Sequence, residues 1–201
     1  MKKIMIYTKH GGSVPALRKY MSINADAVLF LVVFICGLMT GCSLYFSVGA
    51  KNVFSAAASR MAEYGILQNV LLRAVICLVI VIAGFIGGTG AAGMIPLVLL
   101  PLFGGAVHGM IASEVMLSAA NGFGKYALTV LPGGILYFAA LICFCAESAD
   151  TSKKTAALLF FRRTEHPEVK RYAIRCAVWF GAMLLGALTD HITDRIFSGL
   201  F

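Results

Sequence analysis

Charged side chains are scarce in this 201-residue chain: only 13% of its residues are Asp, Glu, Lys or Arg, and just nine are acidic. A water-soluble domain is about a quarter charged and about half apolar, whereas this chain is 60% hydrophobic. So few charges cannot cover a water-facing surface, and the lipid bilayer must be the main solvent. The length allows about five helical spans of roughly 20 residues each, with no room among these residues for a separate soluble domain.

The sequence also lacks the short motifs of common catalytic sites. It contains no G-x-x-x-x-G-K-[ST] phosphate loop, no H-E-x-x-H zinc motif and no G-x-S-x-G nucleophile elbow. No pair of carboxylates lies within an apolar run. We therefore expect no enzyme activity, no catalytic residues and no cofactor.

Metal binding has equally little support. None of the six cysteines belongs to a C-x-x-C pair, and no histidine stands at a metal-ligand spacing from them. Cys143 and Cys145 are two residues apart, so on a helix they point to different sides. We expect the cysteines to be small, buried side chains in helix packing, and we expect no metal site.

Long apolar runs are what the sequence has instead. They predict an all-α, polytopic membrane bundle of about five transmembrane helices. The expected spans cover residues 27–48, 69–85, 94–116, 126–145 and 173–192. A basic tail over residues 1–24 precedes a single membrane domain over residues 25–201. The first run exceeds the about 7–15 residues of a signal-peptide core, so we expect an uncleaved first span.

Proline and glycine interrupt two of these spans. Pro101 removes a backbone hydrogen bond, so the third span should kink or start again there. Pro132 breaks the fourth span after fewer than two turns, and its first part should be a separate short helix or a re-entrant segment. Small residues one turn apart also let helices approach closely. The expected packing positions are Gly37, Gly41, Pro101, Gly104, Gly105, Gly109, Pro132 and Gly133.

The connecting segments are short and polar. A cluster of four glycines after the second span predicts a tight turn there: Gly84, Gly87, Gly88 and Gly90. Residues 49–68 have apolar positions at helical spacing, which suits a short helix at the membrane surface. Residues 117–125 form a second polar loop. The longest polar stretch covers residues 147–170, and its apolar part, 156–161, could lie on the bilayer surface.

The basic residues orient the chain. Most of them lie in the N-terminal tail and in the 146–172 loop, which share one side of a five-span bundle. The positive-inside rule then places the N terminus in the cytoplasm and the C terminus outside, as in a multi-pass plasma-membrane protein. The net charge of +8 fits anionic headgroups rather than nucleic acid, because the basic residues flank spans and lack interleaved aromatic residues.

Two ionisable groups in the third span form the candidate intramembrane polar site, His108 and Glu114. They are six residues apart, roughly 120° from a common helix face, so they are not an obvious dyad. His108 could serve a proton relay or a gated polar pocket. Alternatively, it is a neutral side chain bonded to a carbonyl that Pro101 or Pro132 leaves free.

Other charged groups lie near the ends of spans. Glu114 is either solvated at the outer interface or paired with Arg73 or Lys125. Arg73, at the start of the second span, can extend its guanidinium toward the headgroups. Asp190 and His191 are expected to be interfacial caps near the end of the fifth span.

The middle of the chain resembles the stage II sporulation protein M family of membrane proteins. The match is carried by residues 95–110, IPLVLLPLFGGAVHGM, and residues 126–138, YALTVLPGGILYF, where the sequence from Leu131 to Ile135 opens a span as in that family. The glycine pair of the first span and the last span after a basic segment also fit. The resemblance covers about residues 25–200. It departs at Gly133, where many relatives carry a histidine or another polar residue.

This resemblance implies a non-enzymatic membrane scaffold. The sporulation member of the family is similar to an anchor that localises peptidoglycan-degrading partners at the sporulation septum during engulfment. The expected binding surfaces are residues 49–68, residues 117–125 and the C-terminal end. The alternative is a small permease or the membrane subunit of a transporter, because interrupted helices can frame a site at the membrane midplane. An integral-membrane enzyme is a third reading, and it would need a polar cluster that the sequence does not show.

Overall fold

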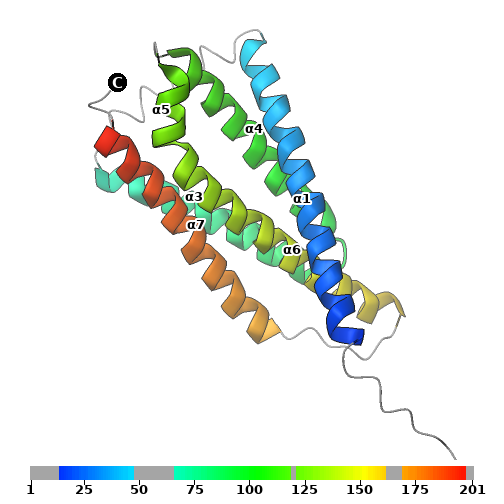
Figure 1. Ribbon diagram of the computed structural model, residues 1–201. Helices are drawn as coiled ribbons and strands as arrows, with labels where there is room; N and C mark the ends of the chain where they lie inside the picture. Colours follow the sequence, from blue (N-terminus) through cyan, green and yellow to red (C-terminus); the bar gives the residue numbers. More distant parts are fainter. Residues whose placement is uncertain (1–13, 48–65, 119–120, 162–168, 198–201) are drawn as a thin grey trace, which may run out of the picture.

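The computed structural model describes residues 14–47, 66–118, 121–161 and 169–197, and the regular elements within them are helices (Figure 1). Five helices are long and apolar enough to cross a membrane, which confirms an all-α, multi-pass membrane protein. A sixth, short helix lies between the third and fourth of them. The elements are α1 (Val14–Phe46), α3 (Ile66–Thr89), α4 (Met94–Ser118), α5 (Gly122–Thr129), α6 (Leu131–Phe161) and α7 (Val169–Phe197).

The helices run alternately up and down the bundle. Figure 1 shows that α1 begins at the end where α6 ends and α7 begins, whereas α7 finishes at the opposite end, near α5. This arrangement agrees with an odd number of crossings. The predicted surface helix over residues 49–68 lies almost entirely outside the described residues.

The closest helix pair is α1 with α4, and glycines make it possible. A Cβ atom built on Gly37 or Gly41 would overlap the backbone of α4, at the carbonyls of Leu102 and Ala106. Conversely, a Cβ on Gly105 or Gly109 would overlap the backbone of α1. The two glycine pairs, each one turn apart, therefore face each other, and the two backbones touch as in small-residue membrane interfaces.

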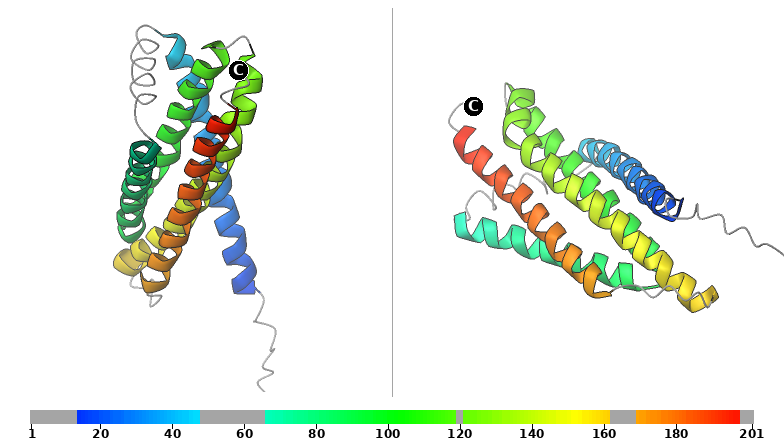
Figure 2. Two further views of the ribbon diagram at one scale, coloured as in Figure 1. Left: turned by 90° about the vertical axis from the view of Figure 1, so that its left-hand side faces the viewer. Right: turned by 60° about the horizontal axis from the view of Figure 1, so that its bottom comes forward.

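The remaining helices pack around α6. Its Leu141, Phe144 and Cys145 are almost completely buried, together with Phe30 of α1 and Met183 of α7. Phe138 of α6 also packs on Phe34 of α1, with ring centroids 4.4 Å apart. α3 contacts α4, α6 and α7 (Figure 2). Because α1, α4 and α7 also contact α6, this helix touches every other long helix of the bundle.

Pro101 and Pro132 occupy different positions in their helices. α4 continues through Pro101 as one helix from Met94 to Ser118, so the predicted restart there is wrong. Pro101 is completely buried, and the packed helices on both sides hold the local turn in place. Pro132 lies in the first turn of α6, where its missing N–H costs no helical hydrogen bond. Residues 122–129 form the separate short helix that was one of the two predicted outcomes.

The glycine cluster after the second span is mostly helical rather than a turn. α3 continues to Thr89, and the turn is confined to residues 90–93. Gly84 lies against the Phe144 ring and Gly88 against the Tyr172 hydroxyl, so tight at both positions that a Cβ would overlap those atoms. These glycines allow α3 to pack closely on α6 and α7. A cluster of glycines in the sequence does not tell such packing positions from a turn.

The predicted polar loop over residues 147–170 is largely helix, because α6 extends to Phe161. Several of its polar side chains bond to other helices. Lys153 Nζ donates to both oxygens of Asp26 at 2.6 and 2.7 Å, and Asp26 is buried on α1. Ser152 Oγ donates to the Gly90 carbonyl at 2.7 Å. These bonds tie the end of α6 to α1 and to the turn between α3 and α4.

A hydrogen-bonded tyrosine joins three helices near the same end. The Tyr172 hydroxyl of α7 lies 3.1 Å from the Gly84 carbonyl of α3 and 2.9 Å from Ser148 Oγ of α6. Because a carbonyl can only accept, the tyrosine donates to Gly84 and accepts from Ser148. Its ring stacks on Phe85 at 5.3 Å between centroids. Glu147 adds a link between α6 and α7 by accepting from Trp179 Nε1 at 3.0 Å.

We expect Gly41→Ala to destabilise the bundle, because the added methyl would collide with the Ala106 backbone and push α1 from α4. Overpacking of this kind costs about 1–3 kcal/mol. The measurement is the thermal unfolding midpoint of the purified protein in detergent. Gly181→Ala is the matched control, because a Cβ there meets no atom within 4 Å. Equal midpoints for the two variants would contradict a backbone-to-backbone contact.

Candidate functional site

A cavity of about 420 Å³ lies among α3, α4, α6 and α7. Its walls are mainly apolar and include Ile76 and Ile80 of α3, Phe103 and Val107 of α4 and Leu141 of α6. Its volume is within the range of about 300–1,000 Å³ for small-molecule sites. The ionisable groups that line it are Arg73, His108 and Asp190, with the hydroxyl of Tyr137 and the thiol of Cys77 as further polar groups.

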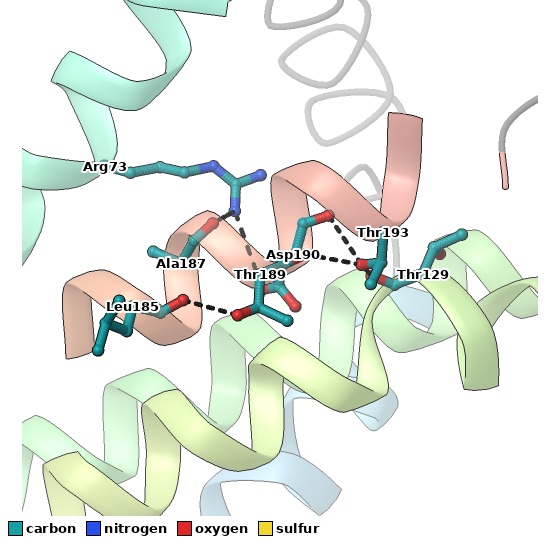
Figure 3. Close-up of polar contacts among 7 residues, drawn as sticks. All are labelled: Arg73, Thr129, Leu185, Ala187, Thr189, Asp190 and Thr193. Carbon is teal, nitrogen blue, oxygen red and sulfur yellow. Dashed lines mark hydrogen bonds and ion pairs between the residues drawn. The ribbon is translucent and has the colours of Figure 1, made fainter. Parts of the chain in front are cut away.

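Arg73 and Asp190 form an ion pair at the rim of this cavity. The Arg73 Nη1 atom lies 3.8 Å from Asp190 Oδ2 and donates a hydrogen bond to the Ala187 carbonyl at 3.3 Å. Figure 3 shows the guanidinium reaching from α3 across to α7. The side chain of Arg73 is 43% exposed and that of Asp190 is 22% exposed. The arginine is therefore the more accessible member of the pair.

Small residues on α6 and α7 make room for the side chain of Asp190, which projects from α7 against α6. A Cβ on Gly133 would overlap Asp190 Oδ1 and crowd the Gly186 carbonyl, and a Cβ on Gly186 would crowd the Tyr137 backbone. One turn further on, Thr193 Oγ1 lies 2.7 Å from the Thr129 carbonyl of α5 (Figure 3). Asp190 thus lies inside α7 rather than at its end and contacts α3 and α6; its position at the membrane interface stays a prediction.

His108 is held by aromatic side chains on two other helices. Its Nε2 lies 2.8 Å from the Tyr126 hydroxyl of α5, and its ring meets the Phe138 ring of α6 edge to face at 4.8 Å. A Cβ on Gly134 would stand 3.0 Å from His108 Cε1, so this glycine opens the space that the imidazole occupies. The recorded partner is a hydroxyl, not the proline-freed carbonyl that the sequence suggested.

Tyr126 is suited to be that partner. The ordinary pKa of a phenol is about 10. The hydroxyl therefore stays protonated at neutral pH and can donate to an unprotonated Nε2. This hydrogen bond links α4 to α5 and fixes the position of the short helix.

Glu114 belongs to a different part of the bundle. It accepts a short hydrogen bond from the Tyr45 hydroxyl of α1. The structure therefore does not bring His108 and Glu114 together, in agreement with their spacing of six residues. Arg73 and Lys125, the two cations considered as partners of Glu114, are not the recorded partners: Arg73 pairs with Asp190 instead.

Sequence reasoning missed the tyrosines that satisfy these groups. Tyr45 lies 69 residues before Glu114, and Tyr126 lies 18 residues after His108. A tyrosine near the end of an apolar helix is the usual residue of a membrane interface, so its role as a hydrogen-bond partner has no local signature. The pairing of Arg73 with Asp190 joins residues more than a hundred positions apart and has no local signature either.

The chemistry that these residues can perform is limited. In the part of the chain that the structure describes, no group of three or more His, Cys, Asp or Glu side chains could hold a metal ion. All six cysteines are free thiols. The polar groups of the cavity come from different helices and are mostly engaged with protein partners. The arrangement is suited to binding an elongated, mainly apolar molecule with one polar end at Arg73.

We expect a double-mutant cycle between Tyr126→Phe and His108→Phe to show a coupling of about 0.6–1.7 kcal/mol, the range measured for hydrogen bonds between membrane helices. The measurement is the free energy of unfolding of each variant in mixed micelles. Phenylalanine keeps the ring and removes the polar atoms, so packing changes little. Fully additive effects would show that this hydrogen bond is energetically unimportant.

Comparison with known proteins identifies no relative. No protein-family model matches the chain, and no curated protein or solved structure matches it. The resemblance to the stage II sporulation protein M family therefore depends on the sequence alone: residues 95–110 and 126–138, the glycine pair of the first span and the last span after a basic segment.

Proposed function

We propose that this chain is a non-enzymatic membrane scaffold that anchors and localises peptidoglycan-degrading partners during septum dissolution and engulfment. In this role the protein supplies a fixed platform in the plasma membrane and its partners supply the chemistry. The proposal combines the family resemblance with the way in which the resembling segments pack.

One observation carries the proposal. The two segments that resemble the family also supply the glycines of the closest contacts around α4 and α6. Gly105 and Gly109, in residues 95–110, lie against the α1 backbone. Gly133 and Gly134, in residues 126–138, admit Asp190 and His108. Because the glycines of both segments pack helices together, we infer a structural role for residues 95–110 and 126–138.

The end of the bundle that carries α5 is the best candidate for the partner surface. Phe123 on α5 is 73% exposed although it lies outside the five candidate spans. An exposed aromatic residue at the end of a helical bundle suits a protein interface. The opposite end holds the basic clusters, including Lys153 and Lys154, which the positive-inside rule assigns to the cytoplasm. Partners that act on the cell wall would then meet α5.

The most direct experiment is affinity capture of the tagged protein from detergent-solubilised membranes of sporulating cells, followed by mass spectrometry. Recovery of wall hydrolases supports the scaffold. Recovery of a cytoplasmic ATPase or a coupling subunit in their place would contradict it and favour the membrane subunit of a transporter.

The cavity favours that second function, a small permease or transporter subunit. It lies among four of the candidate spans, and a histidine and an ion pair line it. A transported substrate should raise the unfolding midpoint of the purified protein at concentrations near its dissociation constant. Such stabilisation by a water-soluble substrate, lost in His108→Gln, is the result that would distinguish transport from scaffolding.

We expect Phe123→Ala to reduce capture of the wall hydrolases severalfold, because removal of a central aromatic anchor typically costs about 2 kcal/mol or more. Phe160→Ala is the matched control: Phe160 is 74% exposed at the other end of the bundle. His108→Ala should also spare capture. The readout is hydrolase recovered per amount of anchor protein. Equal losses for Phe123→Ala and Phe160→Ala at equal protein level would contradict docking at α5.

A further inference from the structure

We propose that the cavity among α3, α4, α6 and α7 is a binding site for one anionic phospholipid, with the phosphate at Arg73 and an acyl chain along the apolar wall. This inference concerns the protein's lipid partner and does not depend on the scaffold role. It starts from the position of one charge relative to the bilayer.

Arg73 lies at headgroup depth. It is three residues inside the α3 span that begins at Val70, which is about 5 Å along a helix that rises 1.5 Å per residue. A guanidinium there can remain at the level of the lipid phosphates. The planar guanidinium of arginine matches the geometry of a phosphate group and can bind it through two parallel hydrogen bonds.

The guanidinium has binding capacity left for an anion. Both of its recorded contacts, with the Ala187 carbonyl and the Asp190 carboxylate, use the Nη1 atom. In Figure 3 both dashed lines from the guanidinium start at one terminal nitrogen. At 3.8 Å, the ion pair with Asp190 is longer than a charge-assisted hydrogen bond of about 2.8 Å. Nε and Nη2 can therefore donate to two phosphate oxygens in the fork geometry that favours arginine.

The apolar wall continues from Arg73 toward the bilayer centre. Ile76 and Ile80 follow at one-turn intervals on α3, so the wall extends about 10 Å along the helix. On α4 the facing residues are Leu99, Phe103 and Val107. Each of these three, like Ile76, is at least 41% exposed, so the cavity opens to its surroundings between α3 and α4. In a bilayer those surroundings are acyl chains.

These features favour a phospholipid over a water-soluble anion. A small anion would use Arg73 but would leave the apolar wall uncovered. A neutral lipid would cover the wall but would not use the guanidinium. A chain with one phosphate at its end matches both parts of the site, and its phosphate charge complements the more exposed member of the ion pair.

The test is lipid-dependent stabilisation of the delipidated wild-type protein in detergent. Dioleoylphosphatidylglycerol, dioleoylphosphatidylcholine and glycerol 1-phosphate are added separately, and native mass spectrometry counts the lipids that remain bound. We expect phosphatidylglycerol to raise the unfolding midpoint and to stay bound as one molecule. Phosphatidylcholine should have a clearly weaker effect, and glycerol 1-phosphate should have none.

Variants then assign the site. Arg73→Gln should weaken phosphatidylglycerol binding about tenfold, which corresponds to the loss of one charge-assisted contact, and Arg73→Lys should keep part of the affinity. Lys125→Gln is the matched control, because it removes one positive charge without lining the cavity. Val107→Trp, which fills the cavity, should weaken phosphatidylglycerol binding while leaving Arg73 intact.

Three results would overturn the proposal. Equal stabilisation by phosphatidylglycerol and phosphatidylcholine would mean that no headgroup is selected. Stabilisation by glycerol 1-phosphate as strong as that by the lipid would mean a small-anion site. Equal losses in Arg73→Gln and Lys125→Gln would mean a general charge effect. Because these assays use the purified protein alone, their failure is separate from a failure to capture wall hydrolases.

Discussion

The backbone contact between α1 and α4 is the constraint on which the rest of the structure depends. In a bilayer, two apolar helices gain little from burying apolar surface, because the lipid tails are equally apolar. Their association depends on how closely the backbones approach. Glycines on both helices, Gly37 and Gly41 against Gly105 and Gly109, permit that approach. A contact of this kind fixes both the axial register and the rotation of α4 relative to α1.

The fixed rotation of α4 determines where its polar residues point. With Gly105 and Gly109 on α1, His108 is directed to α5 and α6, where Tyr126 and Phe138 receive it. Glu114 meets Tyr45 near the end of α1. His108 and Glu114 thus each have a partner on another helix, as low-dielectric surroundings favour. These partners hold the short helix α5 beside the end of the bundle, where Phe123 is exposed.

The sequence is sufficient to predict the helical class, the five spans and the importance of the small residues. The hydropathy of a segment follows directly from its amino-acid composition. Within the bilayer, an apolar segment must satisfy its own backbone hydrogen bonds, and this requirement favours a helix. The ends of the helices are less predictable. α6 continues through Lys153 and Lys154 because Asp26 and Asp150 neutralise them, and the first of these partners lies on another helix. Likewise, the sequence does not distinguish Gly84 and Gly88 from glycines of a turn. Their role in packing depends on Phe144 and Tyr172, which lie against them and are distant in sequence.

The charged and polar groups that line the cavity differ in how accessible they are. His108 and Asp190 have protein partners, whereas the recorded contacts of Arg73 use only Nη1 and its side chain is 43% exposed. A pathway for a polar substrate would need accessible polar groups along its length, and here accessible charge is confined to one rim. Below that rim the walls are apolar and open between α3 and α4. Such a distribution suits an amphiphile that stays in place, and a resident lipid would complete the packing of α3 against α4.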